Sequence, residues 1–287
     1  MNNANFSYRG WKIQFEKTLL DSYDKREIDS LFFGVLEMLG LSKMDFILND
    51  QILTTDEQQK ILTDSLERLL KEEPLQYITG QVFFDDLIFK IDHRALIPRP
   101  ETEELVNWIA KRHTQAKSIL DCCTGSGCIA LSLKNRLPEA KVFGCDLSSD
   151  ALSLARENQK QLDLAVSFFK GDALGSWKEM KGQTYDVIVS NPPYIPQSDD
   201  RLMHKNVLEH EPHMALFVED EDPLLFYREI AKRALLHLKA GGYLYYEIHE
   251  DFPEEMMQLM EDLGYVDVLL KKDLQGKDRM LSAQKRA

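Results

Sequence analysis

Four residues that follow an apolar run have the types and spacing to hold a planar amide or amine group. The run Tyr185 to Ser190 is followed at once by Asn191-Pro-Pro-Tyr194. Proline lacks the N–H that a neighbouring strand needs, so the strand ends here, and the residue before a proline stays extended. The Asn191 side-chain oxygen and the Pro192 carbonyl oxygen can each accept one N–H of an NH₂ group. Pro192 and Pro193 keep these acceptors rigid, and Tyr194 can lie against the flat face of the group.

Such a clamp suits methyl transfer to a conjugated nitrogen, which is a poor nucleophile because its lone pair is delocalised. Holding that nitrogen in line with a sulfonium methyl can remove roughly 7 to 11 kcal/mol from the barrier, against about 1 kcal/mol net for one neutral hydrogen bond. No strong base or metal is required. We therefore expect Asn191, Pro192 and Tyr194 to be catalytic and all four residues from Asn191 to Tyr194 to bind substrate. The alternative is that the two prolines only terminate the strand.

A second cluster of small residues follows the strand-like run Ser118 to Cys122. The sequence Asp121-Cys-Cys-Thr-Gly-Ser-Gly127 leads into a helical pattern. Glycines at such a junction let the backbone approach a ligand closely, beside the free N–H groups of the helix. Gly125-x-Gly127-x-x-Ala130 also fits the dinucleotide fingerprint, although a purely structural turn has the same composition. The pattern indicates a small cofactor.

Acidic residues follow the next two strand-like runs. Asp146 ends the run from Lys141, about twenty residues after the glycine turn, which is the spacing of an acid that accepts both ribose hydroxyls. Its alternative role is to cap the next helix. Asp172 and Ala173 follow the run Val166 to Phe169, on the same sheet edge, where an adenine could be bound. A dehydrogenase and a methyltransferase both fit these loops, and the clamp favours the methyltransferase because hydride transfer has no evident use for it.

The elements that must position these loops alternate between strand and helix. Further strand-like residues run from Tyr243 to Ile248, and the alternation predicts an α/β fold with a mainly parallel sheet and helices on both faces. Before it, apolar spacings of three and four over Ile28 to Leu39 and Ile61 to Leu70 predict a small helical bundle. Val82 to Ile91 reads as a β-hairpin around Asp85 and Asp86.

Pro100, Glu101 and Glu103 have the composition of a helix start, which leaves Arg99 unexplained. We keep Arg99, Pro100 and Glu101 as possible pocket residues. We expect an N-terminal helical domain over residues 1–80, a hairpin linker over 81–97 and the main domain over 98–287.

Composition limits the function further. The chain has 287 residues and a formal net charge of −13, which argues against a protein whose main partner is a phosphate backbone. There is no membrane-length apolar run or signal-peptide core, so we expect a cytoplasmic protein. The four cysteines, three of them between Cys122 and Cys128, suit neither a disulfide framework nor a zinc site, and reduced thiols and no metal are expected.

Six motifs together resemble the HemK/PrmC family of S-adenosylmethionine-dependent protein glutamine methyltransferases, which act on the Gly-Gly-Gln motif of peptide chain release factors. The motifs, which spread over nearly the whole chain, are Glu73-Pro-Leu-Gln-Tyr-Ile-Thr-Gly80, Leu96-Ile-Pro-Arg-Pro-Glu-Thr-Glu103, Thr124-Gly-Ser-Gly-Cys-Ile-Ala130, Ser190-Asn-Pro-Pro-Tyr-Ile195, Glu211-Pro-His-Met-Ala-Leu216 and Lys272-Asp-Leu-Gln-Gly-Lys-Asp-Arg279.

The resemblance implies a Rossmann-like, seven-stranded class I methyltransferase sheet with one antiparallel strand, and an N-terminal helical domain that helps to recognise the protein substrate. By matching position, Asp121 and the loop with Cys123, Thr124, Gly125, Ser126 and Gly127 would hold the methionine part of S-adenosylmethionine, Asp146 the ribose, Asp172 and Ala173 the adenine, and Asn191 to Tyr194 the glutamine. Asn191 would also border the cofactor. The expected partners are release factors, with no membrane or direct nucleic acid binding.

The sequence departs from the family at two places. The family usually has glycine at Cys123, so the backbone is less free to approach the cofactor closely at that residue. The family's Gly-Gly-x-Asp-Gly-Leu is replaced here by Phe217 to Leu224, which has no glycine, so a loop near the substrate has a different shape. The alternatives are a DNA adenine methyltransferase, which would hold a flipped base in the same clamp, a glutamine methyltransferase of a ribosomal protein, and a binder that has lost catalysis.

Overall fold

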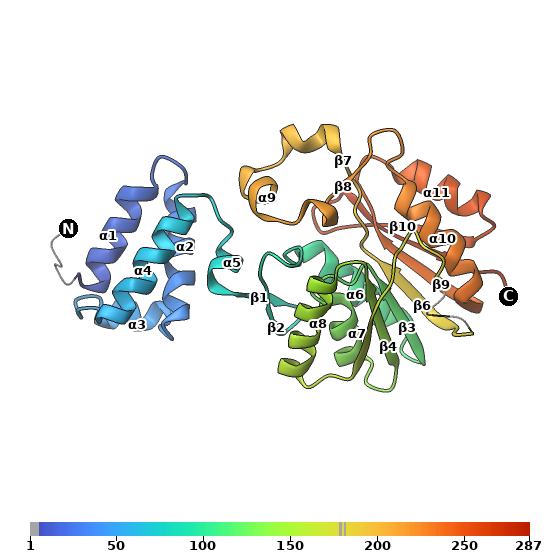
Figure 1. Cartoon of the computed structure of the whole chain (residues 1–287), viewed down its shortest axis with the longest axis horizontal. Helices are drawn as coiled ribbons and strands as arrows, with labels where there is room; N and C mark the ends of the chain where they lie inside the picture. Colours follow the sequence, from blue (N-terminus) through green and yellow to red (C-terminus); the bar gives the residue numbers. More distant parts are fainter. Residues whose placement is uncertain (1–5, 178–179, 181) are drawn as a thin grey trace. The chain divides into compact units, whose positions relative to one another are not determined.

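The computed structural model describes residues 6–177, 180 and 182–287 of the chain (Figure 1). Its contacts divide the described chain into two compact units. One contains the residues up to Gln81 together with His204–His210, and the other contains Val82–Met203 and Glu211–Ala287. No helix among the described residues is long and apolar enough to cross a membrane.

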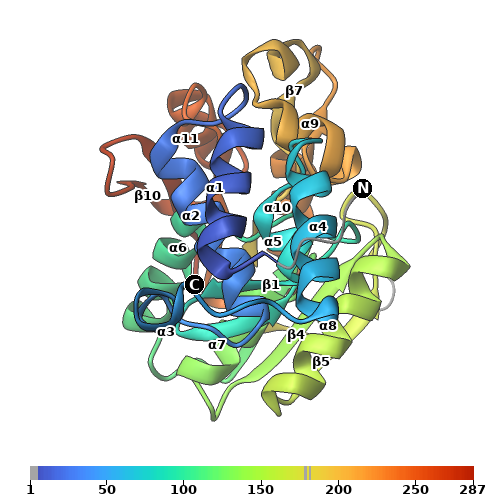
Figure 2. The ribbon, with the colours of Figure 1, turned by 90° about the vertical axis from the view of Figure 1, so that its left-hand side faces the viewer.

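The first unit is a bundle of short helices, in which α1, α2 and α4 pack against one another (Figure 2). Its helices are α1 (Tyr8–Leu19), α2 (Lys25–Met38), α3 (Lys43–Asn49), α4 (Asp56–Leu69), α5 (Leu75–Thr79) and α9 (Lys205–His210). Asp24, Ser42 and Thr55 cap α2, α3 and α4 through reciprocal side-chain and backbone bonds. The helices predicted from Ile28 and Ile61 are confirmed, and Gly40 follows α2 in the left-handed conformation of a C-terminal cap.

The second unit contains a seven-stranded sheet with the order β10-β11-β9-β6-β3-β4-β5. Its strands are β3 (Ser118–Cys122), β4 (Lys141–Asp146), β5 (Val166–Lys170), β6 (Tyr185–Ser190), β9 (Leu238–Glu247), β10 (Val266–Lys272) and β11 (Asp278–Gln284). Neighbouring strands are parallel except that β11 lies antiparallel to both β9 and β10. The predicted seven-stranded sheet with one antiparallel strand is therefore confirmed.

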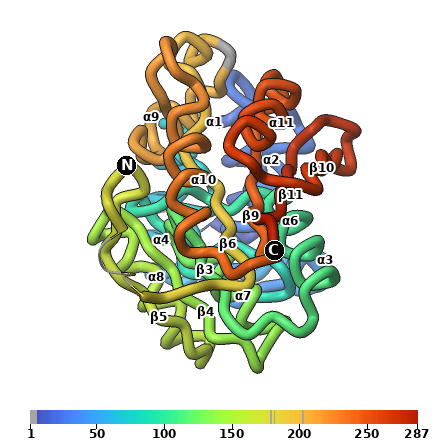
Figure 3. Tube along the Cα trace, turned by 90° about the vertical axis from the view of Figure 1, so that its right-hand side faces the viewer, coloured from blue at the N-terminus to red at the C-terminus, as the bar shows by residue number. Residues whose placement is uncertain are grey.

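Helices cover both faces of this sheet because successive strand residues point to opposite sides. On β6, Val187 and Val189 pack with α6 (Pro100–Arg112) and α7 (Cys128–Arg136), while Ile188 packs with α10 (Leu225–His237) and α11 (Pro253–Asp262). Figure 3 shows α10 and α11 beside each other over the C-terminal part of the sheet. The remaining helix, α8 (Ser149–Leu162), packs on β4 and β5.

The predicted hairpin is also present, as β1 (Gln81–Phe84) and β2 (Leu87–Lys90). Asp85 and Asp86 both have positive φ, as a two-residue hairpin turn requires. Arg136 at the end of α7 donates to both carboxylate oxygens of Asp85, which is 5% exposed. Phe84 and Phe89 are buried in the same core as α6 and α7, so the hairpin is part of the second unit.

Between β6 and α10 the chain forms short elements. Besides α9, these are β7 (Ile195–Pro196), the 3₁₀ turns Gln197–Leu202 and His213–Ala215, and β8 (Phe217–Val218). β7 and β8 pair in parallel, and Leu216 accepts hydrogen bonds from the backbone N–H groups of Tyr194 and Ile195. The glycine-free segment that departs from the family pattern therefore begins as a strand that supports the residues just after the clamp.

Candidate active site

A cavity of about 410 Å³ lies in the second unit, bounded by the loops that follow β3, β4, β5 and β6. This is the edge at which open α/β sheets bind ligands. The residues predicted from the sequence that line the cavity are Arg99, Cys123, Thr124, Gly125, Ser126, Asp146, Asp172, Ala173, Asn191 and Pro193. The fold therefore brings residues that are far apart in the sequence to the lining of one cavity.

Six predicted residues lie outside that lining: Asp121, Gly127, Pro192, Tyr194, Pro100 and Glu101. Asp121 is fully buried and accepts a hydrogen bond of 2.5 Å from the Thr124 hydroxyl, so it holds the loop from behind. Burial raises the pKa of Asp121 to about 7. Gly127 has a φ of 82° at the start of α7, where an added Cβ would lie 3.0 Å from the Phe168 ring.

The glycine loop has an unusual backbone that is bonded to its neighbours, since the N–H of Thr124 donates to the Cys145 carbonyl and the N–H of Gly125 donates to Asp146. Cys123, Gly125 and Gly127 all have positive φ, with 62° at Cys123. Glycine adopts this region without strain, whereas a side chain at Cys123 does so at an energetic disadvantage of roughly 1 kcal/mol or more. All four cysteines are free thiols, as predicted.

Asp146 connects the glycine loop to the end of β4. One carboxylate oxygen accepts the N–H of Gly125 at 2.9 Å, and the other accepts the N–H of Ser148 at 2.9 Å. Burial raises the pKa of Asp146, and these backbone bonds oppose the shift. Ser148, whose hydroxyl accepts from the N–H of Ala151, is the cap of α8, so the alternative that Asp146 caps this helix is wrong.

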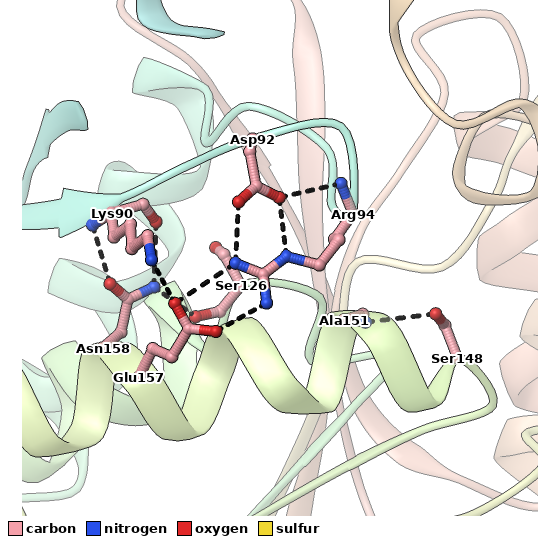
Figure 4. Close-up of polar contacts among 8 residues, drawn as sticks. All are labelled: Lys90, Asp92, Arg94, Ser126, Ser148, Ala151, Glu157 and Asn158. Carbon is pink, nitrogen blue, oxygen red and sulfur yellow. Dashed lines mark hydrogen bonds and ion pairs between the residues drawn. The ribbon is translucent and has the colours of Figure 1, made fainter. Parts of the chain in front are cut away.

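The loop is also tied to the hairpin through one fully buried side chain, Asn158 of α8 (Figure 4). Its amide nitrogen donates to the carbonyl oxygens of Ser126 and Lys90, each at 3.0 Å, and its oxygen accepts the N–H of Lys90 at 2.7 Å. Asn158 therefore fixes the glycine loop and β2 to the same helix. The sequence pattern contained no signal for this residue.

Beside Asn158, Figure 4 shows an ion-pair cluster formed by Lys90, Asp92, Arg94 and Glu157. Arg94, which lines the cavity, donates to both carboxylate oxygens of Asp92 and to both of Glu157. Lys90 also pairs with Glu157. Hydrogen bonds from Arg94 and Lys90 lower the pKa of Glu157 to about 2. The cluster keeps the chain after the hairpin against α8.

Arg99 has two structural roles at the cavity. It is the residue before α6, with extended backbone, and its guanidinium pairs with Glu211 at 2.6 Å. Glu211 is 4% exposed and also accepts the N–H of Ile97. The carboxylate thus joins the segment before α6 to the segment that begins at Glu211. Both segments contain motifs that are recognisable in the sequence, whereas their contact is not.

The clamp residues Asn191 and Tyr194 make side-chain bonds to two residues that sequence reasoning missed. Asn191 donates to the Thr102 hydroxyl, and Tyr194 donates to Glu247. Burial raises the pKa of the Tyr194 phenol and that of Glu247. Pro192 and Pro193 are buried, so apolar packing also fixes the turn after β6.

These features define what the cavity can bind. Three acidic residues, Asp146, Asp150 and Asp172, line the cavity together with apolar residues such as Leu147 and Phe226, which suits a nucleoside with polar hydroxyls and a flat base. The clamp lies on the wall of the same cavity through Asn191 and Pro193. Among the described residues, no group of three His, Cys, Asp or Glu side chains is placed to hold a metal ion.

Comparisons with known proteins agree with this geometry. Residues 100–215 match the model of the methyltransferase small domain, and residues 14–80 match the PrmC N-terminal domain. The chain is 42% identical to the release factor glutamine methyltransferase of Bacteroides thetaiotaomicron over 94% of this chain and 97% of that protein. It is 41% identical to the protein of the same name from Flavobacterium psychrophilum, over 95% and 97%.

Among solved structures, a methyltransferase from Pyrococcus furiosus superposes with a TM-score of 0.53 at 19% identity, covering 78% of this chain and all of that one. This likeness shows the fold alone, whereas the two relatives are similar over nearly their full length. Domain matches, full-length identity above 40% and an Asn-Pro-Pro-Tyr clamp on the wall of the cavity all agree. The chain belongs to the family of release factor glutamine methyltransferases.

Proposed function

We propose that this methyltransferase transfers the methyl group of S-adenosylmethionine to the side-chain amide nitrogen of the glutamine in the Gly-Gly-Gln motif of peptide chain release factors. The observation that carries the proposal is the clamp. Asn191 at the end of β6 borders the same cavity as the glycine loop after β3. The names of the full-length relatives support the choice of substrate. Release factors act in the cytoplasm, and we assign the protein to that compartment.

In this proposal the cofactor lies along the loops after β3, β4 and β5. The loop from Cys123 to Gly127 borders the methionine part, with Asp121 behind it, Asp146 accepts from the ribose hydroxyls, and Asp172 and Ala173 border the adenine. Asp146 uses each oxygen for one backbone N–H, and a carboxylate oxygen has a second lone pair that a ribose hydroxyl can use. No metal takes part.

The substrate amide would be held by the clamp. Its two N–H groups donate to the Asn191 side-chain oxygen and the Pro192 carbonyl oxygen, which fixes the plane of the amide and increases electron density on nitrogen. When bound, S-adenosylmethionine supplies an electrophilic methyl carbon on sulfur. The clamp would hold the nitrogen lone pair in line with that carbon, the cofactor would leave as S-adenosylhomocysteine once its methyl group is transferred, and the proton lost from nitrogen would pass to water. Tyr194 lies beside the clamp, and Pro193 keeps the turn rigid.

The helical unit would serve substrate recognition, as the match of residues 14–80 to the PrmC N-terminal domain suggests. We retain residues 1–80 as that domain, 81–97 as the linker and 98–287 as the catalytic domain. In this scheme the hairpin of the linker packs on the catalytic domain, because Phe84 and Phe89 are buried in the same core as α6 and α7.

The direct test is mass spectrometry of the Gly-Gly-Gln peptide from an unmodified release factor after incubation with the protein and S-adenosylmethionine carrying a deuterated methyl group. We expect the labelled methyl on the glutamine. A matched release factor with Gln replaced by Asn in this motif should remain unlabelled. If cofactor binds and no label appears, the substrate assignment is wrong, and parallel incubations with duplex DNA and with ribosomal proteins would show which other amide or amine is accepted.

A further inference from the structure

Glu247 is a buried carboxylate that accepts hydrogen bonds from the clamp residue Tyr194 and from Thr102, which in turn accepts from the clamp residue Asn191. Its side chain is fully enclosed, since the residue is 2% exposed. One oxygen accepts the Thr102 hydroxyl at 2.5 Å, and the other accepts the Tyr194 hydroxyl at 3.1 Å. Thr102, also 2% exposed, accepts the side-chain amide of Asn191 at 3.4 Å. Two of the clamp residues are thereby connected to one acceptor.

The arrangement follows from the fold. β6 and β9 are parallel neighbours in which Ser190 pairs with Tyr246, so the next residues, Asn191 and Glu247, leave adjacent strands side by side. Thr102 comes from the first turn of α6, directly after Pro100 and Glu101. Pro100 suits the first helical position, and the helix start then turns Thr102 inward. The motif that reads as an ordinary helix start in the sequence therefore supplies a buried hydroxyl.

The direction of these bonds decides which end of the Asn191 amide faces the cavity. A threonine hydroxyl has one hydrogen, and in Thr102 that hydrogen is given to Glu247. Only lone pairs remain, and they accept the NH₂ end of Asn191. If the Asn191 amide were rotated by 180°, its oxygen would face the Thr102 oxygen, and neither atom would have a hydrogen to donate to the other. The side-chain oxygen of Asn191 is thus left as the open acceptor.

We propose that Glu247 is a positioning residue that sets the orientation of Asn191 through Thr102 and the position of Tyr194 directly. This inference rests on the proposed function, because an open oxygen on Asn191 is what a substrate NH₂ group needs. Glu247 touches neither substrate nor cofactor in this scheme. Its contribution is to keep the clamp ready, so that no rearrangement is needed when the substrate enters.

A purely structural role would have a different signature. If Glu247 only satisfied two buried hydroxyls, its loss would lower stability and leave the turnover of the folded enzyme unchanged. If it orients the clamp, its loss lowers kcat while the affinity for S-adenosylmethionine is retained. The split between kcat and cofactor affinity therefore separates the two roles.

The test uses the full chain and five variants, with kcat measured on a release factor and cofactor affinity measured by calorimetry. Thr102→Val removes the hydroxyl at nearly constant shape, and Glu247→Gln replaces one acceptor oxygen by a donor. We expect each to lower kcat by about tenfold or more, as loss of one well-placed hydrogen bond does, with unchanged affinity for S-adenosylmethionine. Thr102→Ser keeps the hydroxyl and should keep most of the activity.

Tyr265→Phe is the matched control, because the Tyr265 hydroxyl is also buried and donates to a backbone oxygen, that of Ala231, away from the clamp. It should lose thermal stability to a similar degree and keep kcat. The kcat of the double variant Thr102→Val with Glu247→Gln should be no lower than that of the less active single variant, since both substitutions interrupt the same chain of hydrogen bonds.

Two outcomes would overturn the inference. One is normal kcat in folded Thr102→Val and Glu247→Gln, and the other is a loss in the double variant equal to the product of the two single losses. A wild-type protein that labels no release factor would instead contradict the proposed function. In that case neutron crystal structures of the wild type and of Thr102→Val still decide the positioning claim, because they distinguish the NH₂ end of an amide from its oxygen. The Asn191 amide should turn in the variant, and an unchanged amide would refute the claim.

Discussion

The two sides of the cavity are fixed by different kinds of atoms. On the side that we assign to the cofactor, the loops are held through their backbone groups. Asp146 accepts the N–H groups of Gly125 and Ser148, and Asn158 donates to the Ser126 carbonyl oxygen. On the clamp side, side chains bind side chains, through Asn191, Thr102 and Glu247. A loop held through its backbone keeps a shape, whereas a chain of hydroxyls and carboxylates sets the direction of single hydrogen bonds.

This contrast has a kinetic meaning. Damage to the cofactor side should appear as weaker binding of S-adenosylmethionine, because the shape of the loop determines how many contacts the cofactor makes. Damage to the clamp side should appear in kcat, because the direction of one amide determines how the reacting nitrogen is held. Three substitutions test whether the two effects separate in this way, and a fourth measures what the ion-pair cluster contributes to stability.

The largest effect is expected from Asn191→Ala. Removing the side-chain acceptor should lower kcat by roughly 10² to 10³-fold, as loss of one preorganised polar group in an active site does, while the calorimetric affinity for S-adenosylmethionine changes little. Asn135→Ala on the exposed face of α7 serves as control. Turnover close to wild type would remove Asn191 from the reaction.

Asp146→Ala should act in the opposite way. The variant loses the carboxylate that holds the Gly125 and Ser148 amides and that we assign to the ribose, so cofactor binding should weaken by about 1 to 3 kcal/mol. At saturating cofactor, kcat should stay near the wild-type value. Asp262→Ala at the exposed end of α11 is the control. A fall in kcat at saturation would show that the two sides of the cavity are not independent.

Asn158→Ala tests whether cofactor affinity depends on the support of the glycine loop or on that of the hairpin. Loss of the three bonds to Lys90 and Ser126 should destabilise the fold by about 1 to 3 kcal/mol, because buried backbone groups are left unpaired, and should weaken cofactor binding. Gln161→Ala is a close control, since Gln161 on the same helix binds only the hairpin, through the Ile88 carbonyl at 2.8 Å. Equal affinity losses in both variants would assign the effect to the hairpin.

The smallest effect is expected from Glu157→Gln in the ion-pair cluster of Figure 4. Glu157 is exposed enough for solvent and salt to screen its pairs with Arg94 and Lys90. The loss in unfolding free energy should be at most about 1 kcal/mol at low salt and smaller at high salt. Thermal unfolding of the variant at two salt concentrations measures this, with Glu139→Gln at an exposed position outside the cluster as the control. A loss that does not depend on salt would indicate packing by Glu157.

The sequence allowed prediction of those parts of the site whose residues are neighbours in the chain. The clamp after β6, the glycine loop after β3 and the acids after β4 and β5 each follow a recognisable strand, and parallel strands bring their ends together. The start of α6 at Pro100 was predicted in the same local way.

Long-range partners could not be predicted, because nothing in a local pattern specifies them. Thr102 and Glu247 are 145 residues apart, and Arg99 and Glu211 are 112 apart. Their pairing depends on which strands become neighbours, and the order β11-β9-β6 is decided by the packing of the whole sheet. A buried carboxylate at the end of β9 has no composition signal of its own, since Tyr243 to Ile248 reads only as a buried strand.

Cys123 has a consequence for engineering. Its φ of 62° is comfortable for glycine and strained for any residue with a Cβ atom. Replacing Cys123 by glycine would relieve that strain, and the gain should exceed the extra chain entropy of glycine by a few tenths of a kcal/mol to about 1 kcal/mol. The glycine loop is therefore a place where a more heat-resistant and less oxidation-sensitive enzyme can be made without touching a residue of the clamp.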